Sequence, residues 1–203
     1  MKLKEGFKQY PKILILGLLV SLVASYFSIG YHHPDEHWQI NEFVAYKLGQ
    51  AKFVDMPWEL GRESRQTIQP AIVYFFAKIL NNFGDYNPFN LALYLRILSA
   101  ILAFIATNLL VLQARNHFKS DSIFKYCLFF ANFFWFIPYV HARFNGENWS
   151  GIFLAFGIYF IIKSFENKFK YLLFFISGIF LGLAFDMRYQ IVFSIAGVGL
   201  WLI

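Results

Sequence analysis

The chain has 203 residues, of which 58% are hydrophobic, 22% are aromatic and only 15% are charged. Soluble domains carry about 25% charged residues, so much of this surface must face lipid, which excludes a soluble, disordered or coiled-coil protein. The 18 Lys and Arg against 12 Asp and Glu form no nucleic-acid-binding motif, which excludes a nucleic-acid partner, and a single cysteine excludes an internal disulfide.

The first predicted span covers residues 13–31 and follows Lys2, Lys4, Lys8 and Lys12. As a helix it reaches about 29 Å, enough for a bilayer core, and the basic residues before it place the amino end in the cytoplasm. A cleaved signal peptide is the alternative. The poor cleavage site at 23–27 and the hydrophobic runs that follow favour a retained span.

A long polar segment, residues 32–87, follows and is predicted to be an outer loop with two surface helices. The first, about 35–48, starts after Pro34 and is amphipathic, with Ile40, Phe43, Val44 and Leu48 at helical spacing. The second, about 68–82, has an apolar run of only about 13 residues, which as a helix covers about 20 Å. That length suits a helix lying at the membrane interface.

Further spans are predicted at 88–112, 123–140, 149–162, 171–185 and 191–203. With the 68–82 helix on the outer surface, the segments 1–12, 113–125 and 163–170 lie inside and hold 10 of the 18 basic residues. Were that helix to span, six of these basic residues would move outside, against the positive-inside rule. The prediction is therefore an all-α polytopic membrane protein with about six transmembrane helices in one domain, 1–203. Because the last run stops at 203 without a polar exit, we expect a fragment.

Two adjacent carboxylates, Asp35 and Glu36, stand at the outer mouth of the first span. An ionised Asp there is suited to general base catalysis, although capping of the surface helix alone would also explain both residues. A metal site formed by His32, His33, Asp35, Glu36 and His37 is a further alternative. It is not favoured, because neighbouring residues on a helix point in different directions.

Arginines occur in every predicted outer segment. Arg62 and Arg65 precede the second surface helix, where they suit either a phosphate ligand or anionic lipid headgroups, and Arg143 and Arg188 lie in the other two outer turns. Arg96, inside the second span, is expected to reach the interface or to pair with an acid such as Asp85.

Several of these residues form motifs that resemble one known family. The sequence His33-Pro34-Asp35-Glu36, with Trp38, Gln39 and Glu42, resembles the first luminal loop of the dolichyl-phosphate-mannose-dependent mannosyltransferases of the GPI-anchor and N-glycan pathways. These enzymes are a branch of the GT-C glycosyltransferases. Later similarities lie at Trp58-Glu59, Arg65, Pro70, Arg96, Arg143 and Arg188.

This resemblance implies a GT-C-like module with two juxtamembrane helices in the first outer loop. It also implies a polyprenyl-phosphate sugar donor and inverting transfer to a glycan or glycolipid acceptor. Asp35 then corresponds to the catalytic base, with Glu36 beside it. The donor phosphate is assigned to Arg65, Arg143 and Arg188, and other substrate contacts are assigned to His33, Gln39, Trp58 and Glu59.

The functional prediction is an inverting glycosyltransferase, specifically a mannosyltransferase, that acts on the extracytoplasmic face. No cofactor is expected. A carrier for lipid phosphates or lipid-linked sugars, similar to a flippase, is the main alternative, but the acids gather at one face rather than at the membrane midplane, which favours an enzyme. A structural subunit is a third interpretation. The expected location is a bacterial plasma membrane, with the endoplasmic reticulum as the alternative.

Overall fold

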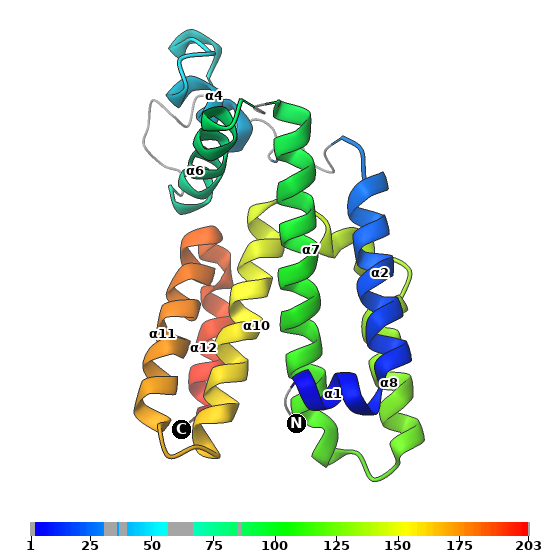
Figure 1. Cartoon of the computed structure of the whole chain (residues 1–203). Coiled ribbons are helices and arrows are strands. Elements are labelled where there is room, and N and C mark those ends of the chain that lie inside the picture. Colours follow the sequence, from blue (N-terminus) through cyan, green and yellow to red (C-terminus); the bar gives the residue numbers. More distant parts are fainter. Residues whose placement is uncertain (1–2, 31–35, 37–39, 57–66, 85–86, 203) are drawn as a thin grey trace.

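The structure, a computed structural model, describes residues 3–30, 36, 40–56, 67–84 and 87–202. In this part of the chain every regular element is helical (Figure 1). The α-helices are α1 (Leu3–Gln9), α2 (Pro11–Phe27), α4 (Glu42–Lys47), α6 (Ile68–Asn82), α7 (Pro88–Gln113), α8 (Asp121–Phe133), α9 (Ile137–His141), α10 (Gly146–Phe165), α11 (Lys170–Met187) and α12 (Val192–Leu202).

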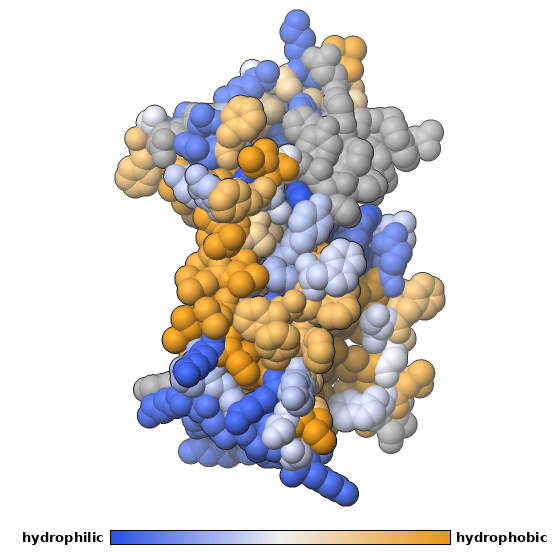
Figure 2. Space-filling model, turned by 90° about the vertical axis from the view of Figure 1, so that its right-hand side faces the viewer, coloured by the Kyte–Doolittle hydropathy of each residue, from blue (hydrophilic) through white to orange (hydrophobic). Residues whose placement is uncertain are grey.

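Three helices in the described part are long and apolar enough to cross a membrane. They are Pro88–His117, Gly146–Phe165 and Lys170–Met187, while Pro11–Phe27 and Tyr189–Leu202 are apolar but shorter. Figure 2 shows a broad hydrophobic band between two hydrophilic ends of the molecule. The composition-based prediction of an all-helical membrane protein is therefore confirmed.

The apolar run 123–140, predicted as one span, is not one helix. Helix α8 ends at Phe133, Phe134 is extended, and α9 begins at Ile137. Pro138 explains the break, since it has no N–H to donate and its ring would clash with the carbonyl of Phe134 in a continuous helix. The break turns the chain toward α7 and determines where His141 and Arg143 lie.

The first helix also ends before its apolar run does. Helix α2 stops at Phe27 rather than continuing to 31, and Gly30 has a φ of 79°, in the left-handed region that glycine tolerates. Released from the helix, the Gly30 carbonyl accepts a hydrogen bond from Arg143.

Helix α7 is the central element of the fold, with α2, α8 and α9 packed on one side and α10 on the other, and α11 packs on α10 (Figure 1). Asn87 caps its start by accepting from the Phe89 amide at 2.9 Å. One apolar core joins α4, α6 and α10 to the N-terminal part and the middle of α7. A second core joins α1, α2 and α8 to its other end.

The two helices of the long loop pack on each other, and α4 covers residues 42–47 of the predicted 35–48. Ile40 and Val44 are buried against Val73 and Ala77 of α6. Helix α6 has the predicted bounds, 68–82.

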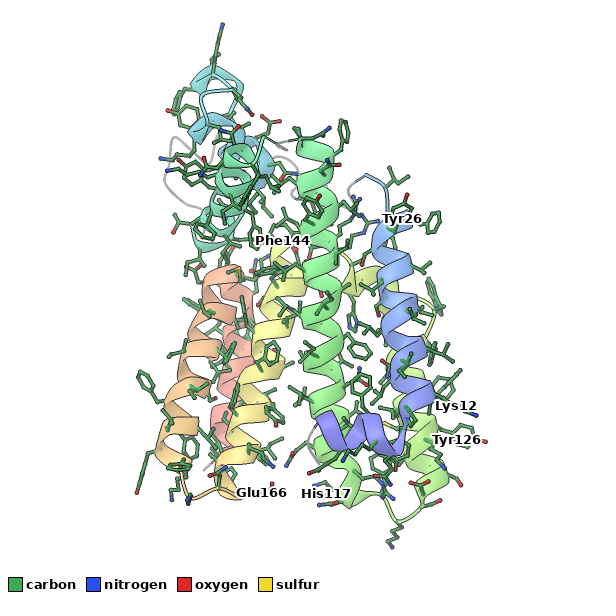
Figure 3. The ribbon with its side chains drawn as sticks, in the orientation of Figure 1. Lys12, Tyr26, His117, Tyr126, Phe144 and Glu166 are labelled. Atoms are coloured by element: carbon green, nitrogen blue, oxygen red, sulfur yellow. The ribbon has the colours of Figure 1, made fainter. Side chains whose placement is uncertain are left out.

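Polar side chains tie the three basic segments together at one end of the bundle. Tyr10 donates to Asp121 at 2.6 Å, and Arg115 contacts the same carboxylate at 3.1 Å. Gln113, at the end of α7, donates to Glu166 after α10. Figure 3 shows Lys12, His117 and Glu166 at this end and Tyr26 and Phe144 toward the other.

Candidate functional site

A cavity of about 590 Å³ lies beside α7, where α9 turns into α10. Its polar lining consists of Thr107, Tyr139, His141, Arg143, Asn145, Glu147 and Asn148. Its remaining wall is small or apolar and consists of Ala103, Ala106, Val140, Gly151, Ile152 and Ala155. The volume is within the range of small-molecule sites, about 300–1,000 Å³.

Arg143 is the central charged residue of this cavity and is only 4% exposed. Its Nη1 donates to the carbonyl oxygen of Gly30 at 3.2 Å and lies 3.8 Å from Oε2 of Glu36. The guanidinium carbon sits 4.3 Å from the centre of the Tyr139 ring, a cation–π contact. Its Nε is buried and has no hydrogen-bond partner in the described part of the chain.

The contact between Arg143 and Glu36 brings together two predicted site residues that are far apart in sequence. Glu36 is 8% exposed. Its Oε1 also lies 3.5 Å from Nδ2 of Asn145, at the limit of hydrogen-bond distance. The first and second predicted outer segments therefore meet at the cavity wall.

Asn145 and Asn148 hold the turn that carries Arg143, and neither was predicted as a site residue. Oδ1 of Asn145 accepts from the Asn148 amide at 2.8 Å, which caps α10. Nδ2 of Asn148 donates to the carbonyls of Arg143 at 2.7 Å and His141 at 3.1 Å. An Asn followed by an acid, Glu147, in the first turn is a helix-start signal that the sequence contained.

The third predicted arginine, Arg188, lies beside the cavity rather than in its lining. It forms an ion pair with Glu147, which does line the cavity. The start of α10 lies close to the end of α11 here, as shown by the 2.9 Å that would separate a Cβ on Gly146 from the Met187 carbonyl oxygen.

His141, at the end of α9, is a further residue that the sequence analysis did not select. Its Nε2 lies 3.4 Å from Oγ1 of Thr107 on α7. Burial lowers the pKa of His141 to about 4, so the imidazole is neutral at physiological pH. The wall thus combines one cationic side chain with a neutral hydrogen-bonding ring.

Arg96 does reach a polar partner, although a different kind from the predicted acid. Its Nε donates to the Ser25 carbonyl at 3.1 Å, linking α7 to α2. Asp85, the predicted partner, lies outside the described residues.

Six predicted site residues also lie outside the described residues, namely His33, Asp35, Gln39, Trp58, Glu59 and Arg65. The same holds for His32 and His37 of the alternative metal site. Within the described part, no three His, Cys, Asp or Glu side chains are close enough together to hold a metal ion.

Comparison with known proteins identifies the family. The sequence model of the Alg9-like mannosyltransferase family matches residues 12–193, which include Glu36, Arg143 and Arg188. No curated protein and no solved structure matches the chain. The resemblance seen in the motifs is confirmed: the chain belongs to the Alg9-like mannosyltransferase family, a GT-C family of dolichyl-phosphate-mannose-dependent mannosyltransferases.

Proposed function

We propose that the chain is an inverting mannosyltransferase that moves mannose from a polyprenyl-phosphate donor to a hydroxyl of a glycan or glycolipid acceptor. Family membership supplies the mannosyltransferase activity and the lipid-linked mannose. The observation that carries the finer proposal is Arg143, a buried cation in the wall of a polar cavity, with one N–H that has no partner among the described residues.

The role assigned to Arg143 is electrostatic. When the bond between the anomeric carbon and the phosphate oxygen breaks, negative charge builds up on the leaving polyprenyl phosphate. An arginine fixed beforehand by Gly30 and Glu36 stabilises that charge without reorganising. Because Arg188 is paired with Glu147, we assign the principal phosphate contact to Arg143 and a supporting one to Arg188 and Arg65.

Asp35 is the proposed general base. It accepts the proton of the acceptor hydroxyl while the hydroxyl oxygen attacks the anomeric carbon from the face opposite the phosphate, which inverts the configuration. Its assignment to this site is supported by the next residue in the chain, Glu36, which is anchored to Arg143 and Asn145. We assign Glu36 to hold Arg143 in place, while His33, Gln39, Trp58 and Glu59 contact the substrates.

The proposed membrane arrangement keeps the six predicted crossings, with the run 123–140 crossing as the interrupted pair α8 and α9, and puts the N-terminus in the cytoplasm of a bacterial cell. The 32–87 loop then lies on the extracytoplasmic side, and its Glu36 pairs with Arg143 of the cavity lining. The gathering of three basic segments at the opposite end supports this orientation, since short cytoplasmic segments are enriched in Lys and Arg.

The test of the proposal is Asp35→Asn in membranes supplied with polyprenyl-phosphate mannose and acceptor. Removing a general base costs about 10²–10⁴ in rate, so we expect turnover to fall by that factor while donor binding persists. Near-normal turnover of well-folded Asp35→Asn protein would remove Asp35 from the mechanism. Asp55→Asn, a change of the same kind in a separate part of the loop, is the matched control and should retain activity.

A further inference from the structure

His141 lines the cavity two residues before Arg143, yet the proposed phosphate chemistry gives it no role. Its side chain is largely buried, and Nε2 faces the Thr107 hydroxyl at 3.4 Å. No other described side chain hydrogen-bonds to its ring. One ring nitrogen therefore has a protein neighbour, and Nδ1 remains for another group.

The chemistry of this ring suits a sugar hydroxyl better than a phosphate. A neutral imidazole presents one donor and one acceptor, and hydroxyls match both. A phosphate would favour a protonated imidazole, whereas the burial of His141 lowers its pKa to about 4. Arg143 supplies the charge for the anion in the same cavity.

The two residues are also held at a fixed separation. Nδ2 of Asn148 donates to the carbonyls of both His141 and Arg143, at 3.1 Å and 2.7 Å. A single amide therefore sets the spacing between a phosphate-binding and a hydroxyl-binding side chain. A hexosyl phosphate likewise carries its phosphate and its ring hydroxyls on one rigid frame.

We propose that His141 is a sugar-binding residue, whose Nε2 is held by Thr107 and whose Nδ1 hydrogen-bonds a hydroxyl of the hexose when its phosphate lies at Arg143. This inference rests on the proposed function, because it takes the donor head group to be the occupant of the cavity. It adds a contact to the sugar that is separable from the contact to the phosphate.

The experiment measures binding of two lipids to the full chain in nanodiscs, polyprenyl-phosphate mannose and polyprenyl phosphate without the sugar. The loss of one hydrogen bond to a neutral hydroxyl predicts that His141→Leu weakens binding of the mannosylated lipid by about 3- to 10-fold. It should leave binding of polyprenyl phosphate unchanged. His141→Asn, whose amide occupies the position of Nδ1, should bind the mannosylated lipid within about 2-fold of wild type, and better than His141→Gln.

The matched controls are the same substitutions at His117, which is exposed at the opposite end of the molecule (Figure 3) and should affect neither lipid. A purely structural role for His141 predicts equal weakening for both lipids, and that result, or no weakening of either, would overturn the inference. Wild-type protein that binds neither lipid would refute the proposed function itself, and the inference with it. Arg143→Gln should weaken the binding of both lipids alike, because both carry the phosphate, and it therefore separates the phosphate contact from the sugar contact.

Discussion

The ion pair between Glu36 and Arg143 offers the most quantitative test of the site. The side chains are 10% and 5% exposed and their charged atoms are 3.8 Å apart. At an effective dielectric constant of about 20, two unit charges at that separation attract by about 4 kcal/mol. Removing one partner of a buried pair typically costs about 3–5 kcal/mol, because the other charge is left uncompensated. Glu36→Gln should therefore lower the free energy of unfolding by about 3 kcal/mol.

A double-mutant cycle separates the pair from other effects of each substitution. Arg143→Met alone should also cost about 3 kcal/mol, but Glu36→Gln with Arg143→Met should cost much less than the sum, leaving a coupling of about 2 kcal/mol. The assay is reversible unfolding in mixed micelles. Lys125→Gln is the matched control, because its pair with Asp121 has side chains 54% and 42% exposed and should contribute at most about 0.5 kcal/mol. If the effects of the two single substitutions add to within about 0.5 kcal/mol, the ion pair does not contribute to stability.

Three further predictions concern packing, pH and orientation. Gly17→Ala places a Cβ 2.7 Å from Oδ1 of Asn132 and should lower the free energy of unfolding by about 1–3 kcal/mol in the same assay. Gly178→Ala is the control and should be nearly neutral, because its Cβ meets nothing within 4 Å. Equal effects of the two substitutions would contradict the packing described. Because burial lowers the pKa of His141 from 6.5 to about 4, the unfolded state binds the proton first as the pH falls. The free energy of unfolding should therefore decrease by up to about 3 kcal/mol between pH 6.5 and 4. An equal decrease in His141→Asn protein would exclude His141 as the cause. A cysteine at Lys168, in a cysteine-free background, should react with an impermeant reagent only after permeabilisation, and labelling of intact cells would reverse the orientation.

The length and apolarity of the runs were enough to predict most helices. Helix α6 has the predicted bounds, and α7 (Pro88–Gln113) differs from the predicted 88–112 by one residue. The prediction of one helix over 123–140 was wrong, because hydrophobicity alone takes no account of Pro138. This proline interrupts the backbone hydrogen bonds inside an otherwise apolar segment. That interruption is also what forms the cavity wall.

The charged residues of the site were partly predictable and the amides were not. The sequence placed Glu36 and Arg143 on the same side of the membrane, but only the packing of α2, α7 and α9 shows that they touch. Asn145 and Asn148 carry no charge, so no electrostatic pattern singles them out. Asn145 with Glu147 gives a helix-start signal, but the contact of Asn148 with the Arg143 turn is visible only in its hydrogen bonds.

The fate of the donor tests the central claim most directly. Protein in proteoliposomes would be supplied with polyprenyl-phosphate mannose labelled in the sugar, together with a membrane extract as the source of acceptor. The account predicts that label passes to the acceptor, that polyprenyl phosphate is released in equal amount, and that Asp35→Asn slows both by about 10²–10⁴. Movement of intact donor across the bilayer without release of polyprenyl phosphate would contradict it and would identify a carrier instead.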